Sequence, residues 1–219
     1  MIVITSLHNG SYTSLADITW TNKVRYAVKH GYNHLAKTDQ FYGYTPGFEK
    51  IQLILDIFEN FSDAEWVVWT GTDSVITNHL IRVEDRICDT HDVIMAGDFN
   101  YAINADVILV KNTSAAKRYL QTIMDRYADY KDHQFQEQQC MLDIHADFTD
   151  VVKLVPQRDI NSYQYNIYTR APWYNQTYTD VAGNDGDWQA GDWIIHWPGT
   201  DLDTRMQLAN KYSKLVKED

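Results

Sequence analysis

Cysteine is scarce in this 219-residue chain, which contains only Cys88 and Cys140. Two cysteines cannot form a disulfide framework, so the chain is not a small secreted domain held together by disulfides, and two reduced thiols in a cytosolic compartment are the simplest account. The length is sufficient for one well-buried apolar core. We therefore expect a single domain over residues 1–219.

Long apolar runs and an excess of positive charge are also missing. No stretch approaches the ~20 apolar residues of a membrane span, and the start of the chain, Met1–Ser6, lacks the basic segment and the length of a signal peptide. The formal net charge is −11. Nucleic acids and anionic membrane surfaces attract clustered Lys and Arg, so neither is expected as the main partner. A small anionic substrate would need a local cation or a bound metal.

Short apolar runs alternate with helical patterns through the first two thirds of the chain. Buried strands are predicted at 2–4, 66–69, 93–95, 107–110, 151–155 and 193–197. Helices are predicted at 15–28 with Gly31 as C-cap, at 51–61, from Thr113-Ser114 to 127, and at 202–216. This alternation predicts an α/β fold, with a mixed, mostly parallel sheet flanked by helices. Residues 161–189 show no sustained period, and such long loops are usually functional.

The segment 64–78 runs from an apolar strand into a short polar turn that carries one carboxylate, Asp73. In open α/β sheets, ligands usually bind at the carboxyl ends of strands. A divalent cation held there by oxygen ligands can bridge a diphosphate. From these residues alone, a strand followed by an ordinary Asx-type turn explains the pattern equally simply.

Several short motifs follow one another in a fixed order along nearly the whole chain. They are Tyr26-Ala27-x-x-His30-Gly31-Tyr32, Phe48-Glu49-Lys50-Ile51, Glu65-Trp66-Val67-Val68-Trp69 through Asp73-Ser74-Val75-Ile76-x-Asn78, Asp98-x-Asn100-x-x-x-Asn104-Ala105, Glu137-Gln138, Val155-Pro156-Gln157-Arg158 with Asn161-Ser162-Tyr163, and Gly191-Asp192-x-x-x-His196-x-x-Gly199. In this order they resemble the galactosyl/mannosyl/xylosyl-transferase family of the fungal and plant Golgi. The resemblance implies a single GT-A domain, the nucleotide-diphospho-sugar transferase fold.

The resemblance also implies a site. Asp73 and His196 would hold Mn²⁺ or Mg²⁺, for which carboxylate and neutral imidazole are compatible ligands. Glu137 and Gln138 would lie beneath the anomeric carbon, and Arg205 would stabilise the departing diphosphate. The nucleotide-sugar donor would contact Thr5, Ser6, Lys50, Thr72, Asp73, Asp98, Asn104, Gly199 and Arg205. Each residue also has a structural alternative: a core histidine, a solvated lysine or arginine, a polar turn, or a surface position on a helix.

Two positions depart from the family pattern. The Asp-x-Asp metal motif is here Gly71-Thr72-Asp73, which predicts weaker metal binding and suggests that Gly71→Asp would restore a missing ligand. Asn104-Ala105-Asp106 stands where the family usually has Asn-Ala-Gly. The resemblance implies retention of the anomeric configuration. Asp106 introduces an acid that could instead act as the general base of an inverting reaction, so it is a candidate for catalysis.

The expected function is transfer of a hexose, pentose or deoxyhexose from a UDP-sugar to a saccharide or glycoprotein acceptor, with metal assistance. Alternatives are a GDP-mannose-dependent mannosyltransferase, and a non-catalytic sugar- or nucleotide-binding module. A nucleotidyltransferase would show a Gly-rich basic loop near the first strand, and Ser6–Ser14 contains no Lys or Arg. The family's anchor and stem are not seen, which suggests a soluble cytoplasmic enzyme of bacterial, phage or large-virus type. Aromatic residues of the long loop are candidates for an acceptor site: Tyr163, Tyr165, Tyr168, Trp173, Tyr174, Tyr178 and Trp188.

Overall fold

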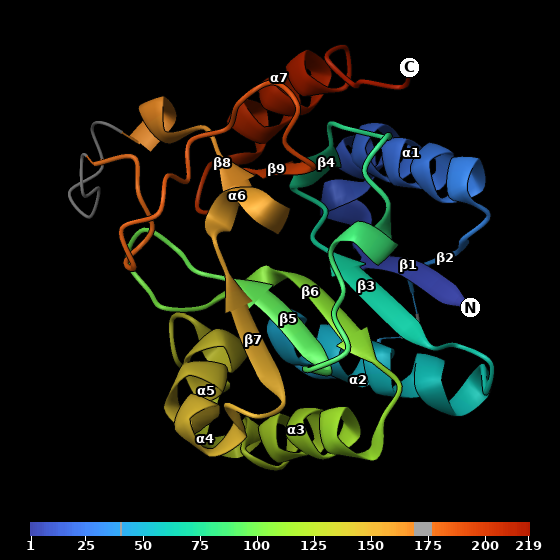
Figure 1. Cartoon of the computed structure of the whole chain (residues 1–219), viewed down its shortest axis with the longest axis vertical. Coiled ribbons are helices and arrows are strands. Elements are labelled where there is room, and N and C mark those ends of the chain that lie inside the picture. Colours follow the sequence, from blue (N-terminus) through green and yellow to red (C-terminus); the bar gives the residue numbers. More distant parts are fainter. Residues whose placement is uncertain (40, 169–176) are drawn as a thin grey trace.

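The computed structural model describes residues 1–39, 41–168 and 177–219. Within them, the main sheet has the strand order β2-β1-β3-β6-β5-β7 (Figure 1). Only β6 runs against its neighbours, so the sheet is mixed and mostly parallel, as the sequence predicts. The strands are β1 Ile2–Leu7, β2 Asn33–Lys37, β3 Trp66–Thr70, β5 Val93–Ala96, β6 Asn104–Lys111 and β7 Val152–Val155.

A smaller sheet brings the far end of the chain to the turn that follows β3. It consists of β4 (Ser74–Ile76), β9 (Ile194–His196) and β8 (Ser162–Tyr163), with β9 in the middle. Strands β4 and β9 are antiparallel, and Ser74 pairs with His196. Because Asp73 immediately precedes Ser74, this register places the carboxylate and the imidazole side by side although they are far apart in sequence.

Helices cover both faces of the main sheet. One face packs against α2, α3 and α5 through a core that includes Ile54, Val67, Ile108 and Leu120. The other face is covered by α1 and the small sheet, and α7 packs in turn on the small sheet and α1. These elements lie together at the opposite end of the view from α3, α4 and α5 (Figure 1). The helices are α1 Thr13–His30, α2 Pro46–Asn60, α3 Ser114–Asp125, α4 Tyr127–Tyr130, α5 Gln136–Ile144, α6 Gln157–Ile160 and α7 Leu202–Tyr212. Short 3₁₀ turns lie at Gly10–Tyr12, Val83–Asp85, His145–Phe148 and Tyr165–Tyr168.

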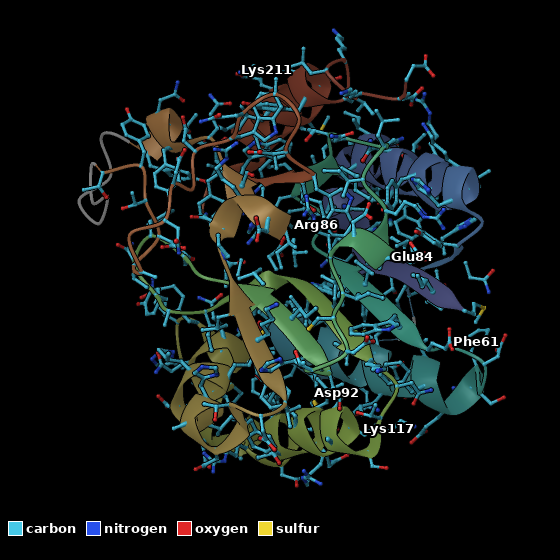
Figure 2. All side chains as sticks on the ribbon, in the orientation of Figure 1. Phe61, Glu84, Arg86, Asp92, Lys117 and Lys211 are labelled. Atoms are coloured by element: carbon cyan, nitrogen blue, oxygen red, sulfur yellow. The ribbon has the colours of Figure 1, made fainter. Side chains whose placement is uncertain are left out.

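The predicted helix ends have clear local causes. Gly31 ends α1 with φ of 70°, a left-handed conformation that suits glycine. Thr113 begins α3 as its N-cap, because its hydroxyl oxygen accepts a hydrogen bond from the backbone N–H of Ala116. The same hydroxyl donates to Asp92 Oδ2 at 2.6 Å, which ties this helix start to the beginning of β5; Asp92 is labelled in Figure 2.

Three details of the sequence prediction are wrong. Val28, assigned to the buried face of α1, is 65% exposed, and the buried face instead contains the polar residues Asn22 and Lys23, which have partners across the core. Phe61, assigned to the apolar face of α2, is exposed because the helix ends at Asn60 (Figure 2). The described parts of 161–189 contain β8 and a 3₁₀ turn, so this segment is not structureless. None of the helices in the described ranges combines the length and apolarity that crossing a bilayer requires.

Candidate functional site

A cavity of about 620 Å³ opens beside the carboxyl ends of β1 and β3. Most of the residues singled out from the sequence line it, although they come from five different elements or loops. These residues are Lys50, Thr72, Asp73, Asp106, Glu137, Gln138 and Arg205. Most of the predicted site residues are therefore assembled in one place. We call this cavity the cleft.

Two carboxylates and one imidazole meet at the base of the cleft. His196 Nε2 lies 3.3 Å from Asp106 Oδ2 and 3.7 Å from Asp73 Oδ1. One ligand atom from each of the three residues lies within 4.8 Å of the others. Asp73 and His196 thus lie together as predicted. Asp106, predicted as a candidate general base, belongs to the same cluster.

Backbone hydrogen bonds hold the turn that carries Asp73. The amide of Trp197 donates to Asp73 O at 3.2 Å, which fastens the turn to the end of β9. The buried ammonium of Lys23 on α1 donates to Gly71 O at 2.6 Å and to Ser74 O at 3.1 Å, on either side of Asp73. Lys23 therefore fixes the turn from the helix packed beneath it.

The charges of this cluster are strongly coupled. Burial disfavours ionisation of Asp73, but the nearby His196 and Arg205 outweigh it, so the pKa of the Asp73 carboxyl is lowered. Burial and the neighbouring Asp73 charge raise the pKa of Asp106, although His196 opposes them. For His196, burial is outweighed by Asp106 and Asp73, and its pKa is raised. His196 and Arg205 are thus the positive charges that balance Asp73.

Arg205 on α7 joins the acidic cluster to the cleft wall. Its Nη2 lies 3.0 Å from Asp73 Oδ2, and its Nη1 donates to the hydroxyl of Tyr12 at 3.0 Å. The guanidinium also lies over the Tyr12 ring, 5.8 Å from its centroid. Its Nε is buried and makes no hydrogen bond within the described part of the chain. Arg205 is therefore a held cation whose guanidinium still has N–H groups without a protein partner among the described residues.

Lys50, Glu137 and Gln138 form the opposite wall. Lys50 is buried rather than solvated, and its Nζ lies 2.7 Å from Glu137 Oε1. Lys50 also donates to the carbonyl of Ala105, while the amide of Ala105 donates to Gln138 Oε1 at 3.0 Å. These contacts bind α2 and α5 to the start of β6, directly beside Asp106. The charge of Glu137 is thus already compensated by Lys50.

Asp98 and Gly199 lie elsewhere, in a second cavity of about 610 Å³. Asn104 is buried between the two cavities: its Nδ2 donates to Asp98 Oδ2 at 3.0 Å, and its Oδ1 accepts from the amide of Asp106 at 2.9 Å. Thr5 and Ser6 are buried and do not line either cavity, and the Thr5 hydroxyl donates to Leu35 O at 2.8 Å. The structure therefore does not bring Thr5 and Ser6 to the other predicted donor contacts.

The aromatic residues of the long loop divide into different environments. Tyr163, Tyr165 and Tyr168 are buried and pack around Phe99. Trp188 packs edge-on against Tyr212 at 4.9 Å between ring centroids. Tyr178 is 39% exposed, and Trp173 and Tyr174 lie outside the described residues. The buried tyrosines pack against one another and against Phe99, and the acceptor site stays a prediction.

Sequence reasoning missed Lys23 and Tyr12. A lysine within a helix is normally predicted to lie on the surface. Lys23 shares a helix face with Leu15, Thr19 and Tyr26, and only this spacing could have indicated that it is buried. Tyr12 lies between β1 and α1, at a position that the sequence motifs did not single out. Neither residue belongs to a recognisable motif.

The family model of the galactosyl transferase GMA12/MNN10 family matches residues 1–93 and 88–206. The chain belongs to this family. A probable alpha-1,2-galactosyltransferase of Schizosaccharomyces pombe, gmh2, is 22% identical over 253 residues, which cover 97% of this chain and 68% of that protein. The chain spans 54% to 68% of the length of the curated S. pombe relatives that match it. The resemblance seen in the motifs and the expected enzyme class, a glycosyltransferase, are thus confirmed at family level.

Solved structures confirm the fold. A glycosyltransferase involved in the glycosylation of the major capsid of PBCV-1 superposes with a TM-score of 0.74, at 16% identity, over 96% of this chain and 98% of that one. The galactosyltransferase LgtC, solved with donor and acceptor sugar analogs, gives a TM-score of 0.60 at 14% identity over 99% and 95% of the two chains. The predicted GT-A fold is therefore correct.

The acidic cluster fits a divalent cation. Two carboxylates and an imidazole form a donor set suited to Mn²⁺ or Mg²⁺. Asp106 Oδ2 is buried and makes no hydrogen bond to any described residue. A buried carboxylate oxygen without a donor is costly, and a bound cation removes that cost.

Proposed function

We propose that this chain transfers a sugar from a nucleoside-diphosphate sugar, with UDP as the nucleotide, to a saccharide or glycoprotein acceptor. The observation that carries this proposal is the cluster of Asp73, Asp106 and His196 at the base of a cleft that also holds Arg205. An acidic cluster beside a held arginine suits a metal-bound diphosphate, because the cation and the guanidinium together balance its charge.

The residues of the cleft have distinct roles in this proposal. A divalent cation, when bound, neutralises the charge that develops on the leaving diphosphate. Arg205, which lines the cleft, orients that diphosphate through its guanidinium and stabilises it as the bond to the sugar breaks. Lys50, Glu137 and Gln138 hold the wall next to Asp106, so they fix the position in which the donor sugar lies.

The stereochemical outcome remains open between two arrangements. Retention follows from the resemblance, with Glu137 and Gln138 beneath the anomeric carbon. The ion pair between Lys50 and Glu137, at 2.7 Å, leaves that carboxylate as an electrostatic partner rather than a free base. Inversion would require a carboxylate on the acceptor side, and the NMR spectrum of the product's anomeric linkage distinguishes the two.

Calorimetric titration tests the proposal. We expect UDP to bind in Mn²⁺ and to bind at least ~10-fold more weakly in a chelator, while Asp73→Ala and His196→Ala remove the difference. Asp132→Ala is the matched control, because that carboxylate is 88% exposed and lies outside the cleft. Parallel titrations with GDP and CMP identify the nucleotide.

Three results would count against the proposal. Equal UDP affinity with and without metal would remove the metal from the mechanism. Preferential binding of GDP would make the chain a GDP-sugar enzyme. Metal-dependent UDP binding without hydrolysis or transfer of the sugar, over a panel of UDP-sugars and saccharide acceptors, would favour the non-catalytic binding module.

A further inference from the structure

The side chain of Asp106 occupies the space directly over Gly71. The β3–β6 register pairs Thr70 with Val107, and the amide of Gly71 continues it by donating to Asp106 O at 3.1 Å. Gly71 and Asp106 are therefore cross-strand neighbours. A Cβ atom added to Gly71 would lie 2.0 Å from Asp106 Oδ1 and 2.4 Å from Oδ2.

This contact makes the two positions depend on each other. Real Cβ atoms essentially never approach another heavy atom closer than 3.0 Å, so any side chain at position 71 must displace the carboxylate of Asp106. A carboxylate carried from β3 at position 71 and one carried from β6 at position 106 would compete for the same volume. With the Asp106 side chain in the conformation seen here, only one of the two positions can place a carboxylate in this volume, and an acid at both positions would require Asp106 to rotate out of it.

The carboxylate that fills this volume faces the other two members of the acidic cluster. Asp106 Oδ2 lies 3.3 Å from His196 Nε2 and makes no hydrogen bond within the described residues. The amide of Asp106 is fixed by Asn104 Oδ1 at 2.9 Å, so the backbone of this residue is held in place. One carboxylate oxygen of Asp106 thus lies within 4.8 Å of a ligand atom of Asp73 and of His196, close enough for one cation to contact all three.

We propose that Asp106 is a ligand of the divalent cation and supplies, from β6, the carboxylate that position 71 lacks on β3. The family pattern to which the motifs were compared has Asp at the position of Gly71 and Gly at the position of Asp106, so this chain carries the same two residue types exchanged across the strand pair. The inference rests on the metal dependence proposed above. It replaces two sequence-based expectations: that the site has simply lost a ligand, and that Gly71→Asp would strengthen it.

Direct Mn²⁺ binding to the parent and four variants tests the exchange, by electron paramagnetic resonance of free Mn²⁺ and by calorimetry without nucleotide. We expect Asp106→Asn to lower Mn²⁺ affinity at least ~10-fold, as loss of a ligand should. Gly71→Asp alone should also weaken binding, because its side chain displaces Asp106. The double variant Gly71→Asp with Asp106→Gly should recover affinity to within ~3-fold of the parent, against the ~10-fold loss of the single variants. Asp132→Asn is the control and should bind as the parent does.

Each contrary result has its own meaning. If Asp106→Asn binds Mn²⁺ like the parent but loses sugar transfer, Asp106 acts on the acceptor and the proposal is overturned. If the double variant has the parent's circular dichroism spectrum and melting temperature yet binds no Mn²⁺, the exchange is refuted. If the parent itself binds no Mn²⁺ with or without UDP, the metal dependence in the proposed function is wrong. That result differs from the two above, which refute only the role of Asp106.

Discussion

At the scale of single residues, Arg205 shows how the cleft combines rigidity with an available donor. Its guanidinium is held by the Asp73 carboxylate and by the hydroxyl and ring of Tyr12. These contacts use the Nη groups and leave the buried Nε without a hydrogen bond among the described residues. A guanidinium fixed in this way needs little reorganisation to receive a phosphate oxygen, which is the arrangement that electrostatic catalysis requires.

We therefore expect Arg205→Met to lower kcat/KM for sugar transfer by ~10²-fold, which corresponds to about 2.7 kcal/mol of transition-state stabilisation. Mn²⁺ affinity measured without nucleotide should not fall, because Arg205 competes with the cation for Asp73 rather than holding it. The control is Arg118→Met on the exposed side of α3. A loss of Mn²⁺ binding that matches the loss of turnover would instead make Arg205 a structural support of the cluster.

At the scale of elements, the site depends on how α1 packs against the connection between β3 and β4. Lys23 spans this contact: its ammonium donates to the carbonyls of Gly71 and Ser74 and is fully buried. Burial lowers the pKa of Lys23 to about 8, although the charges of Asp106 and Asp73 oppose the shift. The helix thus determines where the turn presents Asp73.

Lys23→Met should reduce both stability and metal binding. We expect a loss of about 1–3 kcal/mol in the free energy of unfolding, because Ser74 O loses a donor in a buried place and Gly71 O retains only the Ser74 hydroxyl. Mn²⁺ affinity should fall as the turn relaxes. Urea unfolding and Mn²⁺ titration measure the two effects, and Lys29→Met, on the exposed side of the same helix, is the control. Unchanged Mn²⁺ affinity in a destabilised Lys23→Met protein would show that the turn keeps its conformation without Lys23.

At the scale of the whole molecule, the last residues of the chain pack against the segment that follows β4. The amide of His79 donates to Lys217 O at 2.8 Å, and the amide of Lys217 donates to Thr77 O at 2.8 Å. The imidazole of His79 is buried and hydrogen-bonded to Asn22 at 3.1 Å. Burial, together with the positive charges of Arg25 and Lys29, lowers the pKa of His79 to about 4.

This shift predicts acid sensitivity. Between about pH 4 and pH 6.5 the unfolded chain binds a proton at His79 that the folded chain does not, so stability falls as the pH is lowered through this window. From pH 7 to pH 5 we expect a loss of roughly 1–2 kcal/mol from this residue. Urea unfolding at several pH values should show a shallower pH dependence for His79→Gln than for the parent. His133→Gln, at an exposed position, should leave the slope unchanged; equal slopes in all three proteins would rule out His79 as the cause.

The sequence by itself determined the features that depend on local patterns. Apolar runs such as 66–69 and 107–110 predicted the central strands, Gly31 and Thr113 predicted helix ends, and the ordered motifs predicted the GT-A fold. These features succeed because periodicity, capping and turn chemistry act between residues a few positions apart. The choice of Asp73 and His196 as a pair came from the motifs, and the β4–β9 register is the contact that brings them together.

Only the tertiary structure decided what depends on contacts between distant segments. Lys50 was a candidate donor contact whose alternative was a solvated lysine at a helix start, yet it is buried because α5 brings Glu137 to it. Thr5 and Ser6 follow an apolar run, yet they lie inside the sheet, away from the cleft. Gly71 and Asp106 look like two unrelated departures in the sequence, and only the antiparallel pairing of β3 with β6 places one directly over the other. The physical reason is that strand register and helix packing are set by the burial of the whole core, which no short stretch of sequence encodes.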